Sequence, residues 1–170
     1  MKKGTKLILA ALVMMVSASG AYAQATATAT ATATIVTPIS LTKTVDMNFG
    51  NVAVQASTAG TAVLTPAGAR TSTGGVTLPV TTGTVTAASF TVDGEGAYTY
   101  AITLPSTALT ISSGSNTMTV TTFTSTPSVT GALTAGTQTL NVGATLNVAA
   151  AQASGTYVSG TPFNVTVNYN

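Results

Sequence analysis

The sequence predicts an all-β protein, a β-sandwich with Greek-key connections, from three observations. Apolar and polar residues alternate along many segments, which is the period of a strand with one buried face. Thr, Val, Ile, Tyr and Phe, which favour strands, recur throughout, and no segment has convincing helical periodicity. Short apolar runs are separated by frequent Gly, Pro, Asn and Ser turn signals. The clearest alternation ends the chain, with apolar Phe163, Val165, Val167 and Tyr169.

The first segment has the three parts of a secretory signal. Basic residues precede an apolar run at 7–16, and Ala21-Tyr22-Ala23 supplies the small residues of a cleavage site before Gln24. A membrane anchor is the alternative, but the run is shorter than the about 20 residues that span a bilayer. We therefore predict a signal peptide over residues 1–23. The mature chain is then expected in the periplasm, on the outer cell surface or outside the cell.

Few charges remain after this segment, and they nearly cancel. They are Lys43 and Arg70 against Asp46, Asp93 and Glu95. Without a basic patch, nucleic acid and anionic lipid are poor partners, and no later stretch is apolar enough for membrane insertion. Cys is absent, so the core and the strand ladders hold the fold without disulfides.

Residues 24–37 form an Ala-Thr-rich extension with the period of a strand. Its alternate apolar positions are Ala25, Ala27, Ala29, Ala31, Ala33 and Ile35. Pro38 lacks a ladder donor, so we expect a tail strand, a kink, and then the sandwich domain over residues 38–170. The tail either pairs with a neighbouring subunit or serves as a flexible spacer.

The domain is expected to consist of short strands in sequence. The candidate runs are 39–49, 52–54, 63–64, 76–80, 85–92, 98–104, 109–111, 118–123, 140–148 and 163–169. Asp93-Gly94 between two of these runs predicts a hairpin, and residues 112–116 predict a turn. At Phe123 the apolar parity switches, as at a bulge or a change of sheet. Between Leu140 and Val148 the parity is kept across Gly143.

The chain offers little catalytic chemistry. His and Cys are absent, which excludes Ser-His triads and His- or Cys-based metal sites. Asp93 and Glu95 suggest a weak calcium site or, more simply, a solvated turn, because calcium needs 6–8 oxygen ligands. A carboxylate pair with Asp46, as in a glycosidase, has no support. We predict no catalytic, cofactor-binding or metal residue, and hence no enzyme.

Two polar features have both a functional and a structural interpretation. Tyr98, Tyr100 and Tyr157 can form a platform that stacks on sugars, but the first two share parity with Ile102 and are expected in the core. Asn164-Val165-Thr166 matches a glycosylation acceptor, but it falls inside the predicted last strand and is interpreted as chance.

Several motifs together resemble the secreted bacterial family named domain of unknown function 4402. They are Asp46-Met47-Asn48-Phe49-Gly50, the run 142–148 (VGATLNV), Gly155-Thr156-Tyr157 and the run 165–170 (VTVNYN). The likeness covers the chain from about Ile35 onward. That family is similar to the spore coat U and archaic chaperone–usher pilin group, which implies an immunoglobulin-like sandwich. The resemblance also implies a periplasmic chaperone and an outer-membrane assembly protein as partners.

These observations lead to a first hypothesis and two alternatives. The first is a structural subunit of an extracellular fibre, pilus or coat that self-associates into filaments by β-strand addition. The assembly residues are then the alternate apolar positions of the tail and of the last strand: Ala25, Ala27, Ala29, Ala31, Ala33, Ile35, Phe163, Val165, Val167 and Tyr169. The first alternative is a carbohydrate- or surface-binding module of the cell envelope. The second is ice binding, because Thr-x-Thr recurs at 82–86 and 117–121, but without a fixed period.

Overall fold

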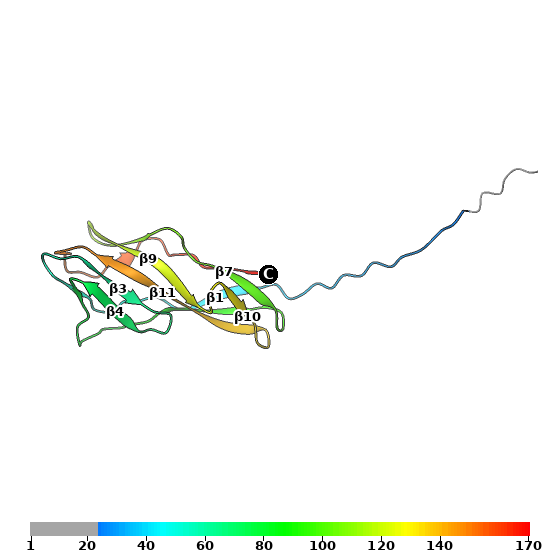
Figure 1. Cartoon of the computed structure of the whole chain (residues 1–170), viewed down its shortest axis with the longest axis horizontal. Helices are drawn as coiled ribbons and strands as arrows, with labels where there is room; N and C mark the ends of the chain where they lie inside the picture. Colours follow the sequence, from blue (N-terminus) through cyan, green and yellow to red (C-terminus); the bar gives the residue numbers. More distant parts are fainter. Residues whose placement is uncertain (1–23) are drawn as a thin grey trace, which may run out of the picture. The chain divides into compact units, whose positions relative to one another are not determined.

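The structure is a computed structural model that describes residues 24–170, so the predicted signal peptide lies outside the described residues. The chain divides between Ile35 and Val36 into two units. Residues 24–170 contain strands and no helix, which confirms the all-β prediction (Figure 1). The strands are β1 (Ser40–Val45), β2 (Ala53–Val54), β3 (Gly60–Leu64), β4 (Arg70–Gly74), β5 (Val76–Thr77), β6 (Ala88–Asp93), β7 (Thr99–Thr103), β8 (Leu109–Ser113), β9 (Asn116–Thr126), β10 (Thr130–Ala132), β11 (Thr137–Val148), β12 (Val158–Ser159) and β13 (Thr166–Tyr169).

Strand β11 is the centre of the domain. One of its edges pairs with β9, and the other pairs first with β6 and then with β3, all antiparallel. The large sheet runs β1-β6-β11-β9-β8-β12, and β4 pairs with β3. The even-numbered residues of β11 from Leu140 to Val148 are buried, as the alternation predicts.

Two smaller sheets cover the large one. The sheet β10-β7-β13 and the pair β2-β5 contribute buried residues to two core clusters. The first cluster joins Phe90, Val92 and Leu140 of the large sheet to Tyr100 and Val167 of the small one. The second lies around Ala144 and Leu146, with Val76 and Val120. Two layers that bury one face each give a sandwich-like arrangement.

The irregularities in the two longest strands coincide. The pairing of β11 with β9 shifts register between Gly143 and Thr145, and the adjacent Thr122 of β9 has φ of 50°. An extra residue at this point explains the parity switch at Phe123 and confirms the predicted bulge. The turn at 112–116 is also confirmed, because Gly114 and Ser115 alone connect the paired strands β8 and β9.

The hairpin predicted at Asp93-Gly94 is wrong. Strand β6 pairs with β1 and β11, whereas β7 pairs with β10 and β13, so this connection passes from one sheet to another. Gly94 does not have the positive φ of a hairpin turn. A Cβ at Gly94 would collide with the Tyr169 hydroxyl, so this glycine allows a side chain from the last strand to approach the backbone.

Several strands differ in length or number from those that the sequence predicts. No strand is assigned over residues 24–39, so the extension pairs as a strand with no other segment of the described chain. The last strand is shorter than predicted, and the run at 76–80 keeps only β5, with Val80 fully exposed. Strands β4, β10 and β12 were not predicted, because runs such as RTSTG and TGA lack apolar alternation.

Candidate functional site: the open edges of β1 and β13

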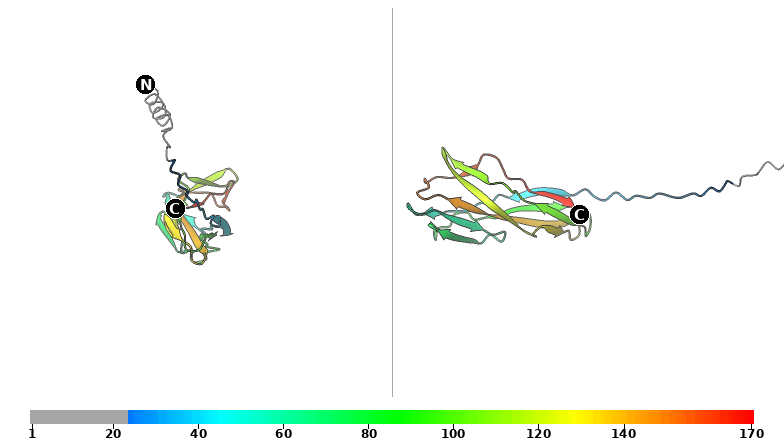
Figure 2. Two further views of the ribbon diagram at one scale, coloured as in Figure 1. Left: turned by 90° about the vertical axis from the view of Figure 1, so that its right-hand side faces the viewer. Right: turned by 45° about the horizontal axis from the view of Figure 1, so that its top comes forward.

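Two strand edges without a partner lie next to each other in the domain. Strand β1 is the last member of the large sheet and pairs only with β6, while β13 ends the small sheet and pairs only with β7. The two strands contact each other, and Figure 2 shows the cyan β1 beside the red β13. No ladder joins them among residues 24–170. Each strand therefore keeps one row of backbone donors and acceptors available for another strand.

Apolar side chains along these edges are only partly covered. Ile39 and Leu41 at β1, and Phe163 and Val165 just before β13, pack against the first core cluster but remain half-buried. Val167 is the one of this set that is buried, at 8% exposure. We call these five residues, with the two edges, the β1/β13 seam. Apolar surface beside unpaired backbone is suited to an added strand that carries small apolar residues.

The end of the seam is fixed by the hydroxyl of Tyr169. It accepts a hydrogen bond from the Glu95 backbone N–H (2.6 Å) and donates one to the Thr37 carbonyl (2.8 Å). The Glu95 carboxylate in turn accepts from the Thr37 backbone N–H (2.9 Å) and hydroxyl (2.8 Å). These four bonds link Thr37, near the start of the domain, with Glu95 and with Tyr169 in the last strand.

The electrostatics of this cluster follow from the same contacts. Hydrogen bonds from the Thr37 backbone and then its hydroxyl stabilise the ionised carboxylate and lower the pKa of Glu95. Glu95 is thus charged at neutral pH and holds Thr37 most firmly there. Nothing in the sequence around Glu95 indicates this role, since Thr37 lies 58 positions away.

The predicted assembly residues fall into two groups. In the unit that ends at Ile35, every described residue from Gln24 onward is exposed and without assigned secondary structure, and Ile35 is 93% exposed. In the domain, Phe163, Val165 and Val167 belong to the seam, and Tyr169 forms the hydrogen bonds described above. The exposed alanines and the seam thus have matching apolar character.

Two of the acidic residues, Asp46 and Glu95, have different partners. Asp46 forms an ion pair with Lys43 (2.6 Å), and Glu95 binds Thr37. Among residues 24–170, no group of three or more His, Cys, Asp or Glu side chains gathers into a metal site. In the same part of the chain, no helix is long and apolar enough to cross a membrane.

The predictions for the tyrosines and for the glycosylation motif need correction. Tyr100 is fully buried and its hydroxyl donates to Gln138 (2.8 Å), as a core position predicts. Tyr98 is 47% exposed, because it precedes β7 and its ring packs on Tyr169 with centroids 5.6 Å apart. Asn164 lies before β13 and is exposed, so only Thr166 of the motif lies in the last strand.

The model of the family described as domain of unknown function 4402 (DUF4402) matches residues 39–169. No curated protein and no solved structure matches the chain.

Proposed function

This chain belongs to the DUF4402 family, and from that premise we propose that it is a structural subunit of an extracellular fibre, pilus or surface coat. Copies assemble by β-strand addition, in which the extension of one copy adds a strand to the next. The observation that carries the proposal is the β1/β13 seam, where two unpaired edges lie together over half-buried apolar residues.

The extension has the dimensions and the pattern for this role. Residues 24–37 reach about 46 Å when extended at about 3.3 Å per residue. The seam side of the last strand, from Phe163 to Tyr169, needs about 23 Å by the same measure. About half of the extension can therefore pair while the rest links two copies. Alternate alanines then face the seam, and alternate threonines face water.

The remaining parts of the proposal concern export and topology. A signal peptide over residues 1–23 directs the chain through the inner membrane. A periplasmic chaperone covers the open edges before assembly, because exposed edges otherwise pair nonspecifically. An outer-membrane assembly protein receives the subunits. The sandwich itself is inferred to be immunoglobulin-like with Greek-key connections.

The test uses the two faces of the extension as matched variants. Ala29→Asp with Ala31→Asp places two charges on the face that is to be buried, and we expect it to abolish filaments. Thr28→Asp with Thr30→Asp adds the same charges to the outer face, and we expect filaments to remain. Negative-stain microscopy and size-exclusion chromatography of the two proteins measure the result.

Deletion of residues 24–34 complements the point variants. The shortened chain is expected to be a folded monomer, since these residues contribute nothing to either core cluster. It should regain a bound strand when a synthetic peptide of residues 24–37 is added, detected by fluorescence anisotropy of the labelled peptide. Filaments from the deleted chain, or equal loss of assembly in both aspartate variants, would contradict strand addition.

A further inference from the structure

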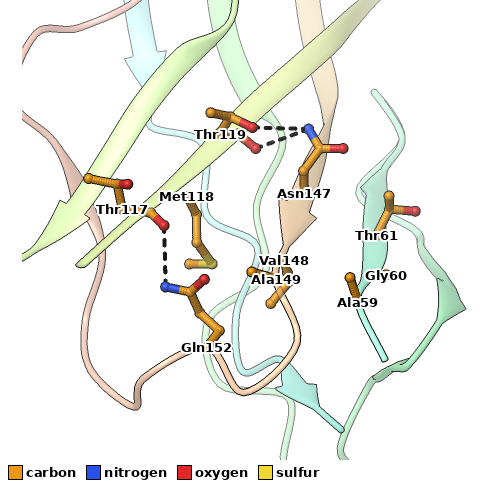
Figure 3. A pocket seen from close by; sticks show the side chains of 10 residues that line it. All are labelled: Ala59, Gly60, Thr61, Thr117, Met118, Thr119, Asn147, Val148, Ala149 and Gln152. Carbon is orange, nitrogen blue, oxygen red and sulfur yellow. Dashed lines mark hydrogen bonds between the residues drawn. The ribbon is translucent and has the colours of Figure 1, made fainter. Parts of the chain in front are cut away.

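A hollow opens where the central strand stops. Strand β11 ends at Val148, whereas β9 and the segment leading into β3 continue on either side of it. Strands that share a neighbour lie about 9.6 Å apart, twice the usual strand spacing. Among residues 24–170 no strand takes the place of β11 beyond Val148, and a hollow of about 550 Å³ results, lined in part by Ala149 and Gln152 (Figure 3). Ligand sites in proteins commonly have about 300–1,000 Å³.

Two side-chain amides in this hollow have a fixed orientation. Asn147 Nδ2 donates to the Thr119 carbonyl (3.3 Å) and the Thr121 hydroxyl (2.9 Å). Gln152 Nε2 donates to the Thr117 carbonyl (3.2 Å) and to the hydroxyl of Tyr157 (2.8 Å). A backbone carbonyl can only accept, so the amide nitrogens must face the protein in both cases.

The amide oxygens are consequently left for a ligand. Among residues 24–170, neither Asn147 Oδ1 nor Gln152 Oε1 has a hydrogen-bond partner, and in Figure 3 both amides turn their nitrogens toward β9. Thr61, Thr117 and Thr119 also line the hollow, with the Thr61 hydroxyl hydrogen-bonded to that of Thr73 (2.7 Å), and Met118 and Val148 add apolar surface. The lining contains no charged and no aromatic residue.

We propose that this hollow binds a neutral saccharide. Sugar hydroxyls donate to the two amide oxygens and exchange hydrogen bonds with the threonines, while sugar methine groups contact Met118. The lack of cationic side chains disfavours phosphate, sulfate or uronate groups, which need positive partners. This site is not the sugar-stacking platform of Tyr98, Tyr100 and Tyr157 described above. Of those three residues only Tyr157 takes part, and it does so by accepting a hydrogen bond that holds Gln152 in place.

The face around the hollow has room for more than one sugar unit. Thr61, Asn147 and Thr119 lie in register across β3, β11 and β9, and Val63, Thr145 and Thr121 form the next row. All six are half-buried and uncharged. Because the hollow is shallow and its contacts are neutral hydrogen bonds, we expect a dissociation constant in the millimolar range for a short oligosaccharide.

Saturation-transfer difference NMR on the full chain tests this site, because it detects weak ligands on monomers and filaments alike. The probes are maltotetraose, cellotetraose and chitotetraose, each up to about 10 mM. We expect a saturable signal from at least one of them. Gln152→Ala and Thr61→Val should each weaken that binding about 3- to 10-fold. Thr91→Val, on the same sheet face but in β6, is the matched control and should bind as the original does.

Two results would rule out saccharide binding in the hollow. No signal from any of the three probes overturns the site, and so does binding that the two hollow variants leave unchanged. If Gln152→Ala loses its β-sheet circular dichroism spectrum, Gln152→Met replaces it, because methionine keeps the length of the side chain without the amide. The hollow and the seam lie on different strands, so filaments without sugar binding refute only this inference. Sugar binding by a chain that never assembles refutes only the proposed function.

Discussion

Gly143, in the middle of β11, offers the sharpest test of how the domain is packed. A Cβ added there would lie 2.6 Å from the carbonyl carbon of Thr65 and 2.8 Å from Pro66 N, and closer still to the Leu64 carbonyl oxygen. Ordinary contacts of a Cβ begin at 3.4 Å. All three neighbours are backbone atoms, at the end of β3 and in the segment that follows it, so no flexible side chain can move aside. Gly143→Ala must therefore displace either β11 or this segment.

The expected cost follows from this displacement. Overpacking of a well-packed core costs about 1–3 kcal/mol, and a clash with backbone at the centre of a sheet belongs at the upper end. About 3 kcal/mol is a large part of the about 5–15 kcal/mol by which domains are stable. For a domain of this size it corresponds to a fall in Tm of about 10 °C. Gly160→Ala is the control, because a Cβ there meets nothing within 4 Å and the backbone has no positive φ.

Urea denaturation followed by circular dichroism measures both variants. We expect Gly143→Ala to lower the midpoint at an unchanged m-value, and Gly160→Ala to stay within about 0.5 kcal/mol of the original. Equal stability of the two variants would refute the close approach of the backbone at Gly143, and with it the described packing of β3 against β11.

Two further predictions concern the hydrogen bonds at the end of the seam. Tyr169→Phe removes two hydrogen bonds and should lower the free energy of unfolding, measured in urea, by about 1–3 kcal/mol. The control Tyr98→Phe, at an exposed ring, should change it little. Equal effects of the two substitutions would count against this role of Tyr169. The pKa of Glu95 is lower in the folded chain than in the unfolded chain, so its contribution to stability is present above the unfolded pKa and is lost as the pH falls through the folded one. Glu95→Gln should remove this part of the acid dependence of Tm, and an unchanged dependence would show that the carboxylate does not hold Thr37 in solution.

What the sequence could predict depended on how local the cause was. The alternation from Leu140 to Val148 predicted the central strand, and the parity switch at Phe123 predicted the bulge, because both patterns lie within a few residues. The partner of β6 was mispredicted, since Asp93-Gly94 is as suited to a crossover as to a hairpin. The choice between them depends on Tyr169, whose ring and hydroxyl pack against this loop from the far end of the chain.

The candidate site divides in the same way. Phe163, Val165 and Val167 were identified from their spacing alone, because a half-buried strand has a clear period. Their neighbours Ile39 and Leu41 were seen only as part of a strand, since nothing in one chain segment indicates which other edge lies beside it. No pattern in the sequence indicates the hollow beyond Val148. It exists because β11 stops while its neighbours β9 and the segment before β3 continue, and these three segments are far apart in the sequence.

The sharing of β11 by both core clusters has a consequence for how the molecule opens. Neither cluster can dissolve while the other persists, because each needs the same strand, so the amides of β11 should exchange with deuterium only through global unfolding. Strands β1 and β13 are different, since each is held by a single neighbour. They can detach in small fluctuations that leave the centre intact, and their amides should exchange far sooner. A domain built this way keeps a rigid interior while its two edge strands move, which suits the strand addition proposed above.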